Sequence, residues 1–85
     1  MANEDKKHGV RIIVNTREKE WDKETISYRE VVILAFGSYS EDPLVRYTVN
    51  YSKGPKENRE GSLTQGQSVL VKNEMIFDVT ESNKS

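Results

Sequence analysis

One short segment carries both a start signal and a stop signal for a helix, and it limits how the rest of the chain can fold. Ser27 and Glu30 are spaced as in a capping box, where each side chain satisfies a free backbone N–H of the other residue. Gly37 follows the last apolar residue, where a left-handed backbone commonly ends a helix. The sequence therefore predicts a helix from Tyr28 to Phe36, about 13 Å long at ~1.5 Å per residue.

This predicted helix is apolar on more than one side. Every residue from Val31 to Phe36 is apolar, and such a run wraps around a helix instead of forming a single stripe. One side must therefore lie on a sheet, and another must be covered by a loop or a partner. Leu44, in the connection that follows the helix, is the candidate cover.

Five other segments have the composition of strands. They are residues 10–15, 20–22, 45–51, 69–71 and 75–79. The first is rich in β-branched residues, and in the third Val45, Tyr47, Val49 and Tyr51 share one face. Polar turns are expected at 16–19 and 72–74, and a loop at 52–61, with Leu63 filling the core beneath it.

The order of these elements favours one architecture. A hairpin, a helix, a strand, a short strand and a last strand leave one helix to cover one face of a mixed sheet of four to five strands. The first and last strands are the most apolar, so we expect them side by side at the centre. This is an α+β, β-grasp domain over residues 9–79, with a flexible arm at 1–8 and a flexible, polar tail at 80–85.

Composition narrows the possible partners. A chain of 85 residues supports one domain, and a formal charge of −1 creates no field that would steer it to nucleic acid or an anionic membrane. No apolar run reaches the ~18 residues of a membrane span. Tyr47 and Tyr51 could stack on nucleic-acid bases, but their phase with Val49 directs them toward the core.

Groups for catalysis or metal binding are scarce. The chain has no cysteine, and its single histidine, His8, lies in the charged N-terminal arm. Neither a zinc site nor a nucleophilic triad can be assembled from such a set. The sequence therefore predicts a protein that is not an enzyme, with no catalytic residues, no metal and no cofactor.

Taken in order, several segments resemble a known family. They are Ile12-Ile13-Val14-Asn15, Ile26-Ser27-Tyr28, Val31 to Phe36, Tyr47-Thr48-Val49, Lys53-Gly54-Pro55, Gly61-Ser62-Leu63, Gly66, and Val69 through Val79. The first is similar to the opening strand of ubiquitin, and the whole set resembles the bacterial multiubiquitin family of ubiquitin-like domains. The resemblance implies a bacterial cytoplasmic protein, encoded beside activating, conjugating and deubiquitinating-peptidase-like enzymes.

The resemblance also implies a role for the C-terminus. A modifier of this kind offers its terminal carboxylate, here that of Ser85, to an adenylating enzyme, and a conjugating enzyme passes it to target proteins. Ser82, Asn83 and Lys84 would form the tether, with a reach of roughly 20 Å from Val79 at ~3.3 Å per residue.

Known modifiers usually end in Gly-Gly, whereas this chain ends in Asn83-Lys84-Ser85. The partner enzymes would then accept serine, a peptidase would process the end, or the chain would be an already shortened product. The same ending argues against a sulfur carrier, and it leaves open an alternative, a β-grasp module that binds partners without covalent attachment.

A partner-binding patch is expected on the sheet face opposite the helix. By strand phase, Ile13, Arg46, Thr48 and Ile76 lie on that face, where two isoleucines with a polar rim have the anatomy of a modest interface. The other reading is that these are scattered surface residues that bind nothing.

Overall fold

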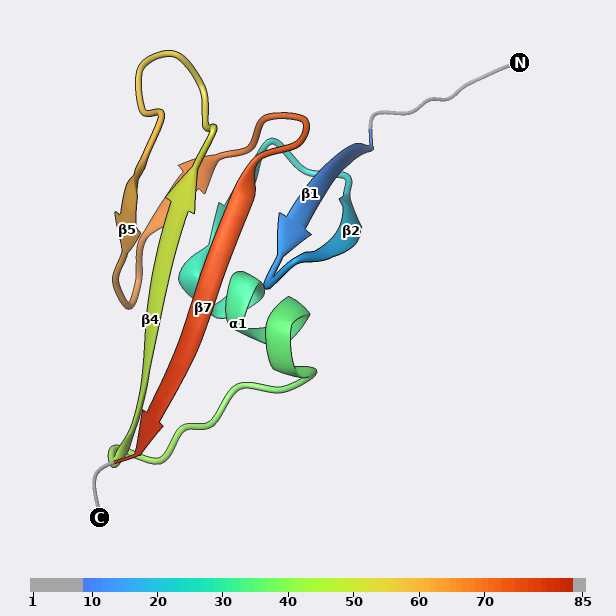
Figure 1. Cartoon of the computed structure of the whole chain (residues 1–85). Coiled ribbons are helices and arrows are strands. Elements are labelled where there is room, and N and C mark those ends of the chain that lie inside the picture. Colours follow the sequence, from blue (N-terminus) through green and yellow to red (C-terminus); the bar gives the residue numbers. More distant parts are fainter. Residues whose placement is uncertain (1–8, 84–85) are drawn as a thin grey trace.

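A computed structural model describes residues 9–83 of the chain. It has one mixed sheet in the order β2-β1-β7-β4-β5, a separate two-stranded sheet of β3 and β6, and one helix, α1 (Figure 1). The elements are β1 (Val10–Val14), β2 (Arg17–Trp21), β3 (Thr25–Ser27), α1 (Tyr28–Phe36), β4 (Val45–Ser52), β5 (Gly61–Leu63), β6 (Ser68–Leu70) and β7 (Ile76–Asn83). The arm predicted at 1–8, Lys84 and Ser85 lie outside the described residues.

The sheet confirms the predicted β-grasp arrangement. β1 and β7 are parallel neighbours at its centre, and all the other neighbouring strands are antiparallel. The helix lies across one face of this sheet (Figure 1). The parallel pair requires a crossover connection, and α1 is part of the chain that makes it. The fold is therefore α+β, with one helix covering one face of the sheet.

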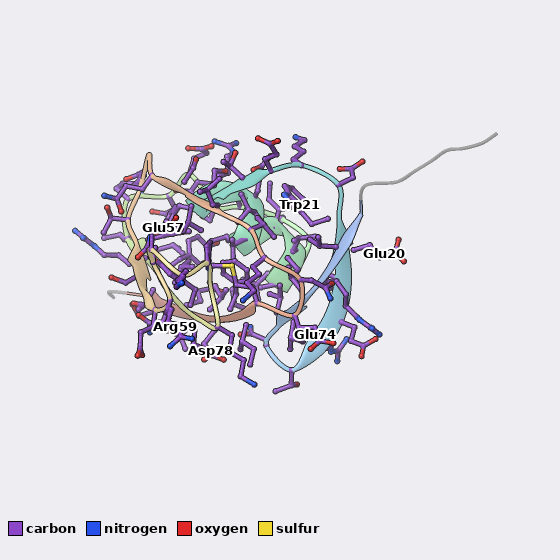
Figure 2. The ribbon with its side chains drawn as sticks, turned by 90° about the horizontal axis from the view of Figure 1, so that it is seen from above. Glu20, Trp21, Glu57, Arg59, Glu74 and Asp78 are labelled. Carbon is purple, nitrogen blue, oxygen red and sulfur yellow. The ribbon has the colours of Figure 1, made fainter. Side chains whose placement is uncertain are left out.

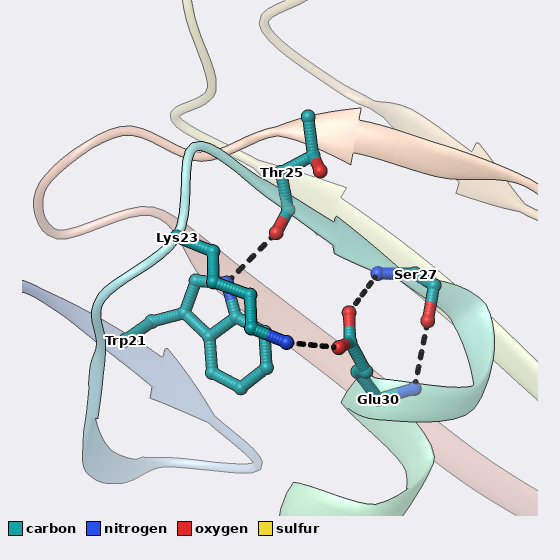
Figure 3. A network of polar contacts seen from close by, with 5 residues as sticks. All are labelled: Trp21, Lys23, Thr25, Ser27 and Glu30. Carbon is teal, nitrogen blue, oxygen red and sulfur yellow. Dashed lines mark hydrogen bonds and ion pairs between the residues drawn. The ribbon is translucent and has the colours of Figure 1, made fainter.

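The helix has the predicted bounds and the predicted ends. Ser27 Oγ accepts a hydrogen bond from Glu30 N at 3.1 Å, and Glu30 Oε1 accepts one from Ser27 N at 2.9 Å (Figure 3). Lys23 Nζ lies 3.1 Å from Glu30 Oε2. At the other end Gly37, at φ 85°, donates to the carbonyl of Ile33. Local sequence signals therefore set both ends of the helix.

The core lies between the helix and the inner face of the sheet. Phe77 is the largest fully buried side chain, and Leu63 is buried as predicted. Buried side chains from the helix and strands complete the core: Ile12, Val14, Ile26, Tyr28, Val31, Val32, Val49, Tyr51, Val69, Met75 and Val79. No residue of this core is charged, so no buried ion pair contributes to holding the layers together.

The prediction that Leu44 covers the helix is wrong. Leu44 is 52% exposed, because it lies in a turn that is closed by a hydrogen bond from Val45 N to Asp42 O. The helix residues Ile33 and Phe36 stay 40% and 43% exposed. What packs beside the helix instead is an aromatic group, described below.

We call Tyr28, Tyr39 and Tyr47 the tyrosine cluster. The ring of Tyr39 lies 6.1 Å from that of Tyr28 and 5.4 Å from that of Tyr47, and the ring of Phe36 lies 5.8 Å from Tyr47. Arg29 covers the ring of Tyr39 at 4.8 Å. The cluster fixes the connection after the helix against the helix and β4.

The hairpin differs from the prediction in its turn. The predicted turn spans residues 16–19, whereas the structure turns over Asn15 and Thr16 alone and starts β2 at Arg17. Both turn residues have positive φ, 52° and 70°, as two-residue hairpins of this twist require. The charges of β2 obscured the strand, because edge strands commonly carry them.

The predicted short strand at 69–71 is present as β6, but it pairs with β3 outside the main sheet. Ile26 lies opposite Val69, and both side chains are buried. The sequence predicts no strand at residues 25–27, where Ser27 is the expected N-cap of the helix. This small sheet closes the end of the core where α1 begins.

We expect Phe77→Ala to lower the free energy of unfolding by about 3–5 kcal/mol, because the largest buried side chain would leave a cavity. Small domains have only about 5–15 kcal/mol of stability in total. Urea unfolding followed by tryptophan fluorescence measures the change. Leu70→Ala is the matched control, since Leu70 is 53% exposed and its loss should change stability by about 0.5 kcal/mol or less. Equal effects of the two substitutions would contradict the assigned core.

The capping box predicts a pH dependence of stability. Partial burial favours the neutral form of Glu30, but hydrogen bonds from Ser27 and Lys23 outweigh it and lower the pKa of Glu30 from its usual 4.5. The stabilisation is therefore present above pH 4.5 and is lost as the pH falls through the lowered pKa. Wild type should exceed Glu30→Gln in stability at neutral pH, and the gap should close in acid. Glu57→Gln controls for the loss of one carboxylate, and a gap that persists unchanged into acid would count against this role.

Candidate functional site

The strand that carries the C-terminus is the candidate functional element. β7 begins at the centre of the sheet, where Ile76 and Phe77 pair with Ile13 and Val14 of β1. On its other side β7 pairs with β4 along its whole length, from Ser52 opposite Ile76 to Val45 opposite Asn83. Its last described residue lies at the far end of the fold from β1, beyond the helix (Figure 1).

The prediction of a flexible tail from Thr80 onward is wrong for residues 80–83. These residues continue β7 and pair with residues 45–48 of β4. Their polar side chains gave no strand pattern, and the side chains of Thr80, Glu81 and Ser82 are exposed. The partner of these residues is the backbone of β4. The sequence of residues 80–83 alone gives no sign of that partner. Of the predicted tether, Lys84 and the terminal Ser85 lie outside the described residues.

Asn15 marks the point where β1 leaves β7. Its side-chain amide donates to Val79 O at 3.0 Å and accepts from Val79 N at 2.8 Å. The side chain thus takes the place that the next strand residue would have held. The sequence predicts Asn15 only as the last residue of the first strand. An asparagine at the end of a predicted strand is a usable signal for a turn, since asparagine tolerates positive φ better than most residues do.

The structure brings together only part of the predicted patch. Ile13 and Ile76 are register partners on adjacent strands, and both are half-buried. Thr48 and Arg46 lie opposite Thr80 and Ser82, which are about 13 and 20 Å along β7 from Ile76 at ~3.3 Å per residue. We therefore call Ile13 and Ile76 the isoleucine pair. Arg46 and Thr48 belong instead to the part of β4 that holds the end of β7.

Charged side chains surround the fold and do not converge on a point. Glu20, Glu57, Arg59, Glu74 and Asp78 are all exposed (Figure 2). Arg11 and Glu18, near the isoleucine pair, form an exposed ion pair at 3.5 Å. Within residues 9–83 no three acidic or imidazole side chains gather in a way that could hold a metal ion. No helix in this part of the chain is long and apolar enough to cross a membrane.

The hydroxyl groups of the tyrosine cluster hold β4 in place. Burial raises the pKa of Tyr28, so its hydroxyl stays protonated and donates to Tyr47 O at 2.8 Å. Tyr47 Oη in turn accepts from Ser40 N at 3.0 Å. An open groove of about 610 Å³ runs beside these residues, and its lining includes Asp42, Arg46 and Gln65. The arrangement supports β4; it does not assemble an acid, a base and a nucleophile.

Comparison with known proteins agrees with this architecture. Residues 10–83 match the model of a protein family described as multiubiquitin. No curated protein and no solved structure matches the chain. The matched range runs from the first residue of β1 to the last residue of β7, so it includes every strand and the helix. The chain belongs to the multiubiquitin family, and its fold is a ubiquitin-like β-grasp domain.

Proposed function

We propose that this chain is a protein modifier that is conjugated to its targets through the C-terminal carboxylate of Ser85. A partner adenylating enzyme activates the carboxylate, a conjugating enzyme transfers it, and a peptidase processes or releases the modifier. The pathway is a bacterial, ubiquitination-like one in the cytoplasm. The observation that carries the proposal is β7, which starts in the core and delivers the C-terminal end of a ubiquitin-like domain to the far tip of the fold (Figure 1).

The chemistry needs little from the modifier itself. A carboxylate oxygen attacks the α-phosphorus of ATP, and pyrophosphate leaves as the acyl-adenylate forms. A nucleophile on the enzyme then displaces AMP, and a target amine finally displaces that nucleophile to form an amide. The enzymes supply the catalytic groups. The modifier supplies a carboxylate at the end of a strand, and the exposed side chains of residues 80–82 place no apolar anchor on it.

Recognition by the partner enzymes requires a surface as well as a carboxylate. The isoleucine pair provides one, since two apolar side chains meet across adjacent strands on the face away from the helix. This pair also supports the second candidate function, a module that binds partners without covalent attachment. The two functions differ in whether they need the C-terminus.

Incubation with ATP and the cognate activating and conjugating enzymes should yield a conjugate whose junction, mapped by mass spectrometry, lies at Ser85. Deleting residues 83–85 should abolish the conjugate, because the new terminal carboxylate, on Ser82, lies three residues short of the end that the enzyme activates. The same deletion should leave non-covalent binding nearly unchanged, because no buried side chain is described beyond Val79. A junction at an internal residue, or a conjugate that survives the deletion, would contradict the proposal.

Ile13→Asp should slow transfer to the conjugating enzyme by about tenfold, equivalent to about 1.4 kcal/mol, because a charge replaces half of the isoleucine pair. Leu70→Asp is the matched control, since Leu70 is an exposed aliphatic residue on the separate two-stranded sheet. Thermal unfolding of both variants checks that each remains folded at the assay temperature. Transfer of folded Ile13→Asp at the wild-type rate would remove the isoleucine pair from the recognition surface.

A further inference from the structure

The two halves of β7 are held very differently. Its first half lies between β1 and β4, and the facing part of β4 is itself flanked by β5 at Val49 to Tyr51. Its second half, residues 80–83, pairs only with residues 45–48 of β4. Among residues 9–83, no third strand joins this part of the ribbon (Figure 1). An isolated two-stranded ribbon is at best marginally stable in water.

The side chains deepen this contrast. Phe77 and Val79 are buried, whereas Thr80, Glu81 and Ser82 are exposed. Thr80, Glu81 and Ser82 therefore contribute no side chain to the core. β4, the strand that pairs with residues 80–83, is anchored more firmly. Its Tyr47 is held by Tyr28, Ser40 and the neighbouring aromatic rings. The end of β7 can leave while β4 stays where it is.

Asn15 sets the point at which detachment of the end of β7 from β4 would stop. Its two hydrogen bonds grip the backbone N–H and C=O of Val79 from the β1 side. Because alternate residues of a strand point their backbone groups to opposite sides, Thr80 and Ser82 direct theirs toward β4. The bonds that join the end of β7 to the fold are thus those to β4.

We propose that residues 80–83 form a latch segment that lies closed on β4 and must detach from it, about a hinge at Val79, before the C-terminal carboxylate can be activated. This inference rests on the proposed function. With the segment closed, residues 80–83 are held along β4 and cannot serve as part of a tether. With it open, the six residues from Thr80 onward reach roughly 20 Å at ~3.3 Å per residue, enough to thread into an enzyme. The fraction of open molecules then limits the rate of activation.

A reversible covalent lock tests the latch segment. Arg46 lies directly opposite Ser82, and partners in antiparallel strands have Cα atoms about 4.5–5.5 Å apart, within the range of about 4.4–6.8 Å that a disulfide spans. The chain has no cysteine, so Arg46→Cys/Ser82→Cys can form only this intramolecular disulfide. Adenylation by the cognate activating enzyme should be at least about tenfold slower in the oxidised variant than in the same variant after reduction, an effect of ~1.4 kcal/mol or more.

The matched control is Asn50→Cys/Asp78→Cys, a lock on the same two strands and the same face but within the half of β7 that stays in place. Its oxidised and reduced forms should be adenylated at equal rates. Equal rates for the two forms of Arg46→Cys/Ser82→Cys would overturn the latch and leave the proposed function intact. If no form is adenylated, wild type included, both proposals fail.

Hydrogen exchange measures the opening without any enzyme. In the wild-type chain the amides of Thr80 and Ser82 should exchange at least about tenfold faster than that of Asp78, because local opening at a strand end needs less free energy than opening of the core, and tenfold is ~1.4 kcal/mol. The Arg46–Ser82 disulfide should slow these two amides and not that of Asp78. Equal protection of all three amides in the wild type would show that residues 80–83 open only with the whole domain, and would overturn the latch.

Discussion

The parallel pairing of β1 with β7 joins the two ends of the described chain, and the rest of the fold depends on it. Ile13 and Val14 meet Ile76 and Phe77 at the centre of the sheet, so nearly the whole sequence lies between the paired strands. Parallel strands cannot be joined by a tight turn, and the intervening chain must cross over. That crossover carries α1, whose buried side chains Val31 and Val32 share the core with Phe77.

This central pair also decides how the C-terminus is presented. β1 ends at Val14, and the side chain of Asn15 completes the contact at Val79. Beyond that point, β4 is the one strand among residues 9–83 that pairs with β7. The same strand therefore places Phe77 and Val79 in the core at one end and has a single strand beside it at the other. In the proposed function, the exposed end serves the chemistry and the buried end serves stability.

The second support of that end is β4, and its anchoring is aromatic. Tyr47 receives hydrogen bonds from Tyr28 and Ser40 and packs against Tyr39. These contacts tie the connection after the helix to the strand that pairs with residues 80–83. The connection is thus more than a link between the helix and β4, because it stiffens the surface on which the C-terminal segment lies. The isoleucine pair lies on the sheet face opposite the helix, near the start of β7. It is therefore separate from residues 80–83.

The sequence by itself determined those parts of the structure that depend on residues close together in the chain. The capping box at Ser27 and Glu30, the glycine at 37, and the inward phase of Val49 and Tyr51 all follow from spacing, and together they imply one helix on one face of a mixed sheet. The isoleucine pair followed from the same strand phases.

Only the tertiary structure decided which backbone groups find partners far along the chain. It paired the polar residues 80–83 with β4, gave Asn15 its contact with Val79, left Leu44 exposed, and separated Arg46 and Thr48 from the isoleucine pair. The physical reason is that backbone hydrogen bonds carry no side-chain signature. Whether a polar segment forms a strand therefore depends on whether folding places the unpaired backbone groups of another strand beside it.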